Sequence, residues 1–171
     1  MKKIFLIGVL SILIQGCSNN IAPYRPNPSE CKLIAKKLKN VFVAVKTRDP
    51  ENNSIGCRML GPIYTPGKVS FQHYIQKAFD NTLAYTDSLA KDQNSASYVI
   101  EVNIDDINSN TISGEWTIRG TVAINGGPPM NLNSVTRYGT AYVAWTACEN
   151  AAGAFSHATE EFIGLVFSKI R

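Results

Sequence analysis

Alternation of apolar and polar residues predicts three strands in the second half of the chain. In residues 97–107 the even positions from 98 to 104 are apolar, and the odd positions from 101 to 105 are polar. Residues 115–125 repeat this pattern after a turn at 108–114, and residues 132–145 are expected to form a third strand. A period of two is typical of a sheet that buries one face and exposes the other. These ranges therefore predict an antiparallel sheet with one solvated face.

The pattern leaves open which face of the third predicted strand is buried. One face carries Thr136, Tyr138, Thr140 and Tyr142, and the other carries Val135, Ala141 and Val143. If no helix covers the first face, its tyrosines form an open surface for a partner, because Tyr is a favoured interface anchor. If the tyrosines pack on the core instead, the second face points outward. Both interpretations fit the sequence.

Apolar periodicity predicts helices on either side of these strands. Residues 69–86 carry apolar side chains at three-to-four spacing after a candidate N-cap, Ser70. Residues 146–170 form the strongest helical pattern, with small residues in the first half of the apolar stripe. A shorter helix is expected at 29–38, and the apolar run at 41–45 predicts a buried strand.

The order of these elements, β-α-β-β-β-α, predicts an α+β fold. We expect a two-layer sandwich in which a mostly antiparallel sheet of about four strands has two main helices packed on one face.

The N-terminal segment predicts secretion and lipid anchoring. A basic start precedes an apolar run at 4–14, which is too short for a membrane-spanning helix of about 20 residues. Gly16 precedes Cys17, and the step Ile14-Gln15-Gly16-Cys17 resembles a bacterial lipobox. The resemblance implies that residues 1–16 are a signal peptide and that Cys17 is acylated. The alternative is an ordinary cleaved signal followed by a coincidental cysteine.

The residues after Cys17 suggest a location and a linker. Ser18 stands where an Asp would retain a lipoprotein in the inner membrane, so by resemblance we expect the outer membrane, on its periplasmic side, if the organism has two membranes. Residues 17–28 hold three prolines and are expected to form a flexible tether. Residues 29–171 are expected to form a single periplasm-facing domain.

Charge argues against nucleic acid as a partner. Without Lys2 and Lys3 the chain has 15 basic and 13 acidic residues, a net charge of about +2. A basic run within 32–39 (Lys32, Lys36, Lys37 and Lys39) is interpreted as a solvated helix face, whereas nucleic-acid binding favours a concentrated basic stripe.

Three cysteines remain after Cys17, and the oxidising periplasm favours pairing. We favour a Cys31–Cys57 disulfide, although the sequence does not fix the pairing. Cys148 lies in the apolar stripe of the last helix and is interpreted as a small buried group. His73 and His157 have no partners at metal-ligand spacing, so no metal and no cofactor is expected.

The chain contains no recognisable catalytic motif, so we expect no enzymatic activity. Exposed aromatic and arginine residues are better candidates for function. The loop at 55–68 and the outward faces of the predicted strands supply them. Across the hairpin, Asp105 is expected to lie near Arg119 or Thr117. The candidates for a partner surface are Arg58, Tyr64, Arg119, Tyr138 and Tyr142.

Three segments carry a resemblance to known lipoproteins: residues 96–102, residues 114–122, and residues 138–170 with the long helix. With the N-terminal cysteine, they resemble the small outer-membrane lipoproteins of the YajG type and, more distantly, LptE, the lipoprotein that plugs the lipopolysaccharide translocon. The resemblance implies a non-enzymatic accessory role. Cys31, Cys57 and the loop around Arg58 depart from that pattern.

Two hypotheses about function follow. In the first, the protein is an accessory or assembly component of the cell envelope, held to the membrane by its acyl chains and acting through protein–protein contacts. In the second, it is a stand-alone binder of a lipid, a glycan or a peptidoglycan fragment, which would need a concave pocket with convergent polar groups. Self-association through an exposed strand edge is a further expectation.

Overall fold

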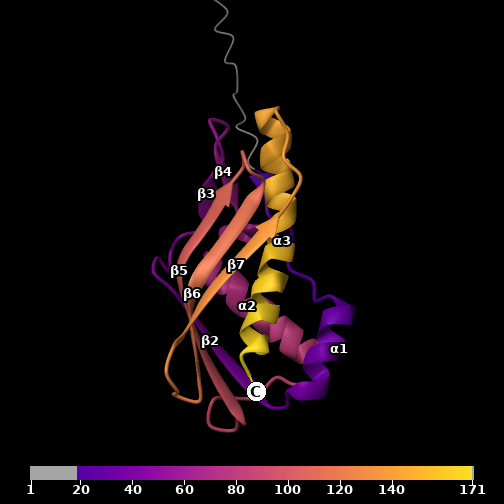
Figure 1. The fold of residues 1–171 in the computed structure, drawn as a ribbon, viewed down its shortest axis with the longest axis vertical. Helices are drawn as coiled ribbons and strands as arrows, with labels where there is room; N and C mark the ends of the chain where they lie inside the picture. Colours follow the sequence, from indigo (N-terminus) through magenta and orange to yellow (C-terminus); the bar gives the residue numbers. More distant parts are fainter. Residues whose placement is uncertain (1–18, 171) are drawn as a thin grey trace, which may run out of the picture.

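Two sheets and three helices form the part of the chain that the computed structural model describes, residues 19–170 (Figure 1). The strands are β1 (Asn19–Asn20), β2 (Val41–Thr47), β3 (Ser54–Gly56), β4 (Pro62–Tyr64), β5 (Tyr98–Asn110), β6 (Glu115–Ile124) and β7 (Met130–Arg137). The helices are α1 (Pro28–Lys37), α2 (Phe71–Tyr85) and α3 (Ala144–Ser168), with a 3-10 turn, η1, at Pro66–Lys68. The predicted α+β class is confirmed.

The larger sheet has the strand order β2-β5-β6-β7, and α2 and α3 pack on one of its faces. β2 runs parallel to β5, whereas β5, β6 and β7 are antiparallel neighbours. The predicted alternation is confirmed on β5, where Ile100, Val102 and Ile104 are buried beneath the helices. A smaller sheet, in the order β1-β4-β3, was not expected as a separate unit.

Aromatic rings fill the space between the sheet and α3. The Phe155 ring lies 4.7 Å from the Trp116 ring and 5.2 Å from the Phe71 ring, between centroids. The indole nitrogen of Trp116 donates a hydrogen bond to the carbonyl of Ala151 at 2.8 Å. The small residues Ala151 and Ala152 let α3 approach the sheet closely enough for that bond, as their position in the sequence suggested.

β7 buries the face that carries Thr136. Within this strand the second interpretation is therefore confirmed, because Val135 points outward. Leu132, Ser134 and Thr136 are buried, whereas Val135 is 48% exposed. The strand ends at Arg137, eight residues earlier than predicted, and α3 begins at Ala144. Residues 138–143, between β7 and α3, leave the sheet. The carbonyls of Ala141 and Tyr142 accept from the side chain of Arg58 and not from a neighbouring strand.

A register shift separates Asp105 from its predicted neighbour. Between β5 and β6, Ile104 pairs with Gly120 and Asp106 pairs with Arg119, so an extra residue bulges from β5. Gly120 is required at this point because a Cβ there would lie 2.1 Å from the carbonyl oxygen of Asn103. Arg119 consequently faces Asp106 at 3.9 Å, and not Asp105 as expected.

The segment expected as a flexible tether contacts the domain between Asn19 and Tyr24. β1 pairs in parallel with β4, and Ile21, 2% exposed, donates from its N–H to the carbonyl of Tyr64. α1 begins after Asn27, which is its N-cap, because the Asn27 side chain accepts from the N–H of Ser29. The predicted cap Ser70 of α2 is confirmed. Within residues 19–170, no helix combines the length and apolar character that crossing a membrane requires.

The disulfide joins Cys57 to Cys148, so the predicted Cys31–Cys57 pairing is wrong. The loop after β3 lies at the N-terminal end of α3, while Cys31 is buried on α1, far from that loop along the long axis of the molecule (Figure 1). Cys148 is therefore both buried, as expected, and cross-linked, which its place in an apolar stripe did not indicate. Cys17 lies outside the described residues.

Candidate functional site

Arg58 joins three segments at one end of the molecule. It follows Cys57 in the loop between β3 and β4 and has a left-handed backbone, with a φ of 47°. Its guanidinium donates to the carbonyl of Thr111 at 2.8 Å and to the carbonyls of Ala141 and Tyr142, each at 3.2 Å. A guanidinium presents five donors in a fixed fork, so this one side chain holds both the β5–β6 turn and the segment before α3.

The disulfide reinforces the same junction. Cys57 precedes Arg58 directly, and Cys148 lies near the start of α3, with both cysteines at most 1% exposed. The covalent link therefore fixes the β3–β4 loop to α3 at the place where Arg58 binds the residues before that helix.

Tyr138 also binds at this junction, through its hydroxyl and its backbone N–H. Its hydroxyl lies 2.9 Å from the hydroxyl of Ser109, and its N–H donates to the carbonyl of Gly114 at 2.7 Å. Gly114 has a φ of +71°, and a Cβ there would lie 2.3 Å from the Tyr138 carbonyl oxygen. Burial raises the pKa of the Tyr138 phenol. Tyr138 is thus a half-buried structural contact, while Tyr142, four residues later, is fully exposed.

Exposed apolar side chains gather around Arg58 on the three segments that it joins. The β3–β4 loop contributes two, the β5–β6 turn contributes one, and the segment entering α3 contributes three. We call this surface the apolar tip, and its members are Met59, Leu60, Ile112, Tyr142, Val143 and Trp145. A shallow groove of about 600 Å³ crosses it, lined by Arg58, Ile112, Thr140, Ala141 and Tyr142.

Tyr64 and Arg119 make their contacts elsewhere. Tyr64 is on β4, where the ammonium nitrogen of Lys68 lies 4.8 Å from the centre of its ring. Arg119 is on the open face of β6, in its exposed pair with Asp106. The structure therefore brings together Arg58, Tyr138 and Tyr142, but leaves the other two candidates outside this junction.

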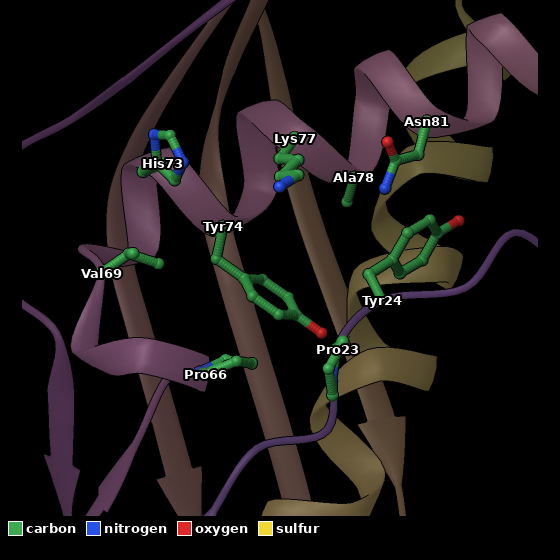
Figure 2. A pocket seen from close by; sticks show the side chains of 9 residues that line it. All are labelled: Pro23, Tyr24, Pro66, Val69, His73, Tyr74, Lys77, Ala78 and Asn81. Atoms are coloured by element: carbon green, nitrogen blue, oxygen red, sulfur yellow. The ribbon is translucent and has the colours of Figure 1, made fainter.

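A small cavity lies between the N-terminal segment and α2 (Figure 2). Tyr24 and Pro23 form one wall, and the side chains of α2 and of the turn before it form the other. The Tyr74 hydroxyl donates to the carbonyl of Ala22 at 3.0 Å, and the Tyr24 hydroxyl lies 3.0 Å from that of Thr82. The cavity measures about 160 Å³, below the range of roughly 300–1,000 Å³ usual for ligand pockets.

The two histidines lie apart, on different helices. His73 is exposed in the first turn of α2, and its N–H donates to the capping hydroxyl of Ser70. His157 lies on α3, 3.4 Å from Glu160 and 3.5 Å from Glu161. Among residues 19–170, no group of three or more His, Cys, Asp or Glu side chains is placed to hold a metal ion.

Comparisons with known proteins identify the fold and no activity. No protein-family model matches the chain, and no curated protein matches it. A solved structure of a protein from Xanthomonas campestris, assigned to family DUF330, covers 89% of this chain and 97% of its own, with 10% identity and a TM-score of 0.50. Another, of an uncharacterized protein, covers 84% and 97%, with 9% identity and a TM-score of 0.48. The likeness to the Xanthomonas protein is one of fold alone, and neither structure identifies a YajG-type lipoprotein or an LptE relative.

Sequence reasoning selected Arg58 and Tyr142 but missed the apolar residues beside them. Met59, Leu60 and Ile112 lie in segments that read as turns, where single apolar residues carry no periodic signal. An apolar residue next to Gly61-Pro62, and another within the predicted turn 108–114, were the available signals, since turns usually favour polar residues.

Proposed function

We propose that this protein is a lipid-anchored component of the bacterial cell envelope that acts as an accessory or assembly factor through protein–protein contacts, without catalysis. Acyl chains on Cys17 hold it in the outer membrane, with residues 19–170 on the periplasmic side. The lipobox-like step before Cys17 supports the anchor. The Cys57–Cys148 disulfide supports an oxidising compartment, because disulfides persist in the periplasm and are rare in the cytosol.

One edge of the larger sheet is closed by side chains of α2. The side-chain amide of Gln76 accepts from the N–H of Val45 at 2.8 Å and donates to the carbonyl of Val43 at 2.9 Å. The Gln72 side chain accepts from the N–H of Thr47 at 3.0 Å. These amides occupy the positions that a neighbouring strand would take, so β2 offers little backbone for pairing with another chain.

The opposite edge, β7, has no such cover. β7 pairs with β6 on one side, and within residues 19–170 the backbone of residues 130–137 makes no hydrogen bond to any other element. Its outward side chains carry a single charge, on Arg137, and include the exposed Val135. Proteins usually protect an exposed edge with charges, proline or a covering segment.

The contrast between the two edges is the observation that carries the proposal. A sheet that closes β2 and leaves eight residues of β7 open is suited to receive a strand from another polypeptide, with specificity from alternate side chains. The stand-alone binder is less well supported. The cavity beside α2 is smaller than a usual ligand pocket, and the larger groove at the apolar tip is shallow, with its polar side chains Arg58 and Thr140 already bonded to backbone carbonyls.

Photo-crosslinking in intact cells tests this function. A photoreactive residue at Val135 is expected to form an adduct with the same protein in independent experiments, identified by mass spectrometry. The matched control is Asn103, which is exposed on the same face but lies on the central strand β5. Labelling of lipid or glycan alone from Val135 would contradict the proposal and support the stand-alone binder. An adduct with a second copy of this chain would identify the expected self-association.

A charge on the edge provides a second test. With the probe moved to Asn133, Val135→Lys is expected to reduce the protein adduct several-fold, because a charged side chain on an edge strand disfavours pairing. Asn103→Lys adds the same charge to the centre of the open face and should leave the adduct unchanged. Equal reductions in both variants would argue for an electrostatic effect of the whole face and against strand pairing.

A further inference from the structure

The apolar tip exposes more apolar surface than a water-facing turn requires. Met59 is 99% exposed, Ile112 is 80% exposed and Tyr142 is fully exposed, and each belongs to a different segment. Single exposed apolar residues are normal, whereas a group gathered from three segments onto one end of a molecule marks a surface that contacts something else.

Three backbone carbonyl groups beneath the tip accept hydrogen bonds from side chains. The Thr111 carbonyl accepts from Arg58 at 2.8 Å and from the Thr140 hydroxyl at 2.6 Å. The carbonyls of Ala141 and Tyr142 accept from the same guanidinium. A loop can move into an apolar medium only if its polar backbone groups are paired internally, and these four bonds reduce that cost.

The chain also limits how far Cys17 can lie from β1. β1 begins at Asn19, which pairs with Ile63, two residues after Gly61 in the loop that carries Met59. Whatever path residues 17–19 follow, two residues span at most about 7 Å. The chain after Asn19 is held on β4, because Ile21 is buried and its N–H donates to the carbonyl of Tyr64. β3, β4 and the start of α3 lie together at the end of the molecule where β1 begins (Figure 1).

We propose that the apolar tip lies in the interfacial layer of the bilayer that holds Cys17, an inference that rests on the acylation proposed above. Its composition fits that layer, where Trp and Tyr place an apolar ring among acyl chains and a polar edge among headgroups. The members of the tip include one Trp and one Tyr and no carboxylate. The tip and the anchor then form a two-point attachment that orients the domain and leaves the β7 edge free for a partner.

Quenching of Trp145 fluorescence tests the contact. The chain has two tryptophans, and the other, Trp116, is 0% exposed in the core. The acylated full-length mature protein is placed in vesicles of phosphatidylethanolamine and phosphatidylglycerol, with or without bromine on acyl carbons near the headgroups. We expect brominated lipid to quench the emission of the wild type and to leave that of Trp145→Phe nearly unchanged, since only Trp116 then emits.

Paired variants separate the tip from general exposure. The double variant Met59→Ser, Ile112→Ser is expected to reduce the inserted fraction of the tip more than about tenfold, because each buried methylene contributes about fourfold to partitioning. The control is Tyr85→Ser, Leu89→Ser, which removes exposed apolar side chains at the C-terminal end of α2 and just beyond it, away from β3 and β4 (Figure 1). The control should retain wild-type quenching.

Mass spectrometry of the same samples distinguishes the two proposals. If Cys17 carries no acyl chain, the proposed lipid anchor fails. If Cys17 is acylated but brominated lipid leaves the Trp145 emission unchanged, the anchor stands and the membrane contact of the tip is refuted. Quenching that persists undiminished in the double serine variant would equally refute it. A protein adduct from a photoreactive residue at Ile112, with no quenching by lipid, would assign the tip to a protein partner instead.

Discussion

A single guanidinium, that of Arg58, supplies donors to three carbonyl groups at the apolar tip. Without it the carbonyls of Ala141 and Tyr142 lose this donor, and the carbonyl of Thr111 keeps only the Thr140 hydroxyl. The bond to the Thr111 carbonyl is part-buried, and loss of a donor there costs about 1–3 kcal/mol, whereas water can bind the exposed carbonyls of Ala141 and Tyr142. We expect Arg58→Ala to lower the free energy of unfolding by about 2 kcal/mol in a urea titration. Arg58→Lys should recover less than half, because an ammonium lacks the planar fork.

Arg119 provides the control for Arg58. It forms an exposed ion pair with Asp106 at 3.9 Å, with 61% and 47% of the two side chains accessible. Pairs of this kind contribute about 0–1 kcal/mol, so Arg119→Ala should change stability by less than about 0.5 kcal/mol. Equal losses in the two alanine variants would contradict the role assigned to Arg58.

Tyr24 makes stability sensitive to alkaline pH. Burial raises its pKa from 10.0 to about 12, with smaller contributions from the charges of Glu160 and Cys31. The folded chain therefore holds this proton more tightly than the unfolded chain, so the stability from this group is complete below pH 10 and is lost as pH rises through 12. Allowing for partial exposure, the loss should be about 1–2 kcal/mol.

Urea unfolding of wild type and Tyr24→Phe across this pH range measures that contribution. The Phe variant cannot ionise, so its stability should fall less steeply above pH 10. Some alkaline loss should remain, because burial also raises the pKa of Tyr74. Identical pH dependence of the two proteins would show that Tyr24 does not contribute.

Among the elements, β2 and α2 illustrate how a helix can close a sheet edge. Gln76→Leu would remove the amide that pairs the N–H of Val45 and the carbonyl of Val43. We expect a loss of about 1–3 kcal/mol, since both groups would lack a protein partner. We also expect concentration-dependent self-association in light scattering, because the exposed edge becomes able to pair.

Lys77→Leu is the matched control for this edge. Lys77 is exposed on the next position of α2 and makes no contact with β2 among the hydrogen bonds of the described chain. The substitution adds the same side chain with a similar gain in hydrophobicity. If it causes as much association as Gln76→Leu, the added leucine and not the opened edge would be responsible.

For the whole molecule, the Cys57–Cys148 disulfide closes a loop with a sequence separation of 91 and ties the small sheet to α3. Removing a native disulfide typically costs 2–5 kcal/mol. We expect the double variant Cys57→Ser, Cys148→Ser to lose about 2–4 kcal/mol in chemical unfolding. Reductant should destabilise the wild type by a similar amount and leave the double variant unchanged. An effect of reductant on the double variant would contradict this assignment.

The local sequence determined the layers of this protein. Period-two alternation in β5 and β6 and three-to-four spacing in α2 and α3 predicted the faces that are buried, and the order of elements predicted an α+β sandwich. These features follow from the sequence because burial of one face of an element is set by residues within that element. The N-cap at Ser70 is local in the same sense, since its bond to the N–H of His73 spans three residues.

Tertiary contacts determined the features that the local sequence did not predict. Residues 17–28 were expected to form a flexible tether, but the part from Asn19 to Tyr24 contacts β4 and α2, which lie far along the chain. The end of β7 was misplaced because Arg58, 83 positions before Ala141, binds the segment that follows. The disulfide partner of Cys57 lies 91 positions away. Composition and periodicity carry no information about which distant residues meet, so the apolar tip and the closed edge of β2 became visible only when the folded chain brought them together.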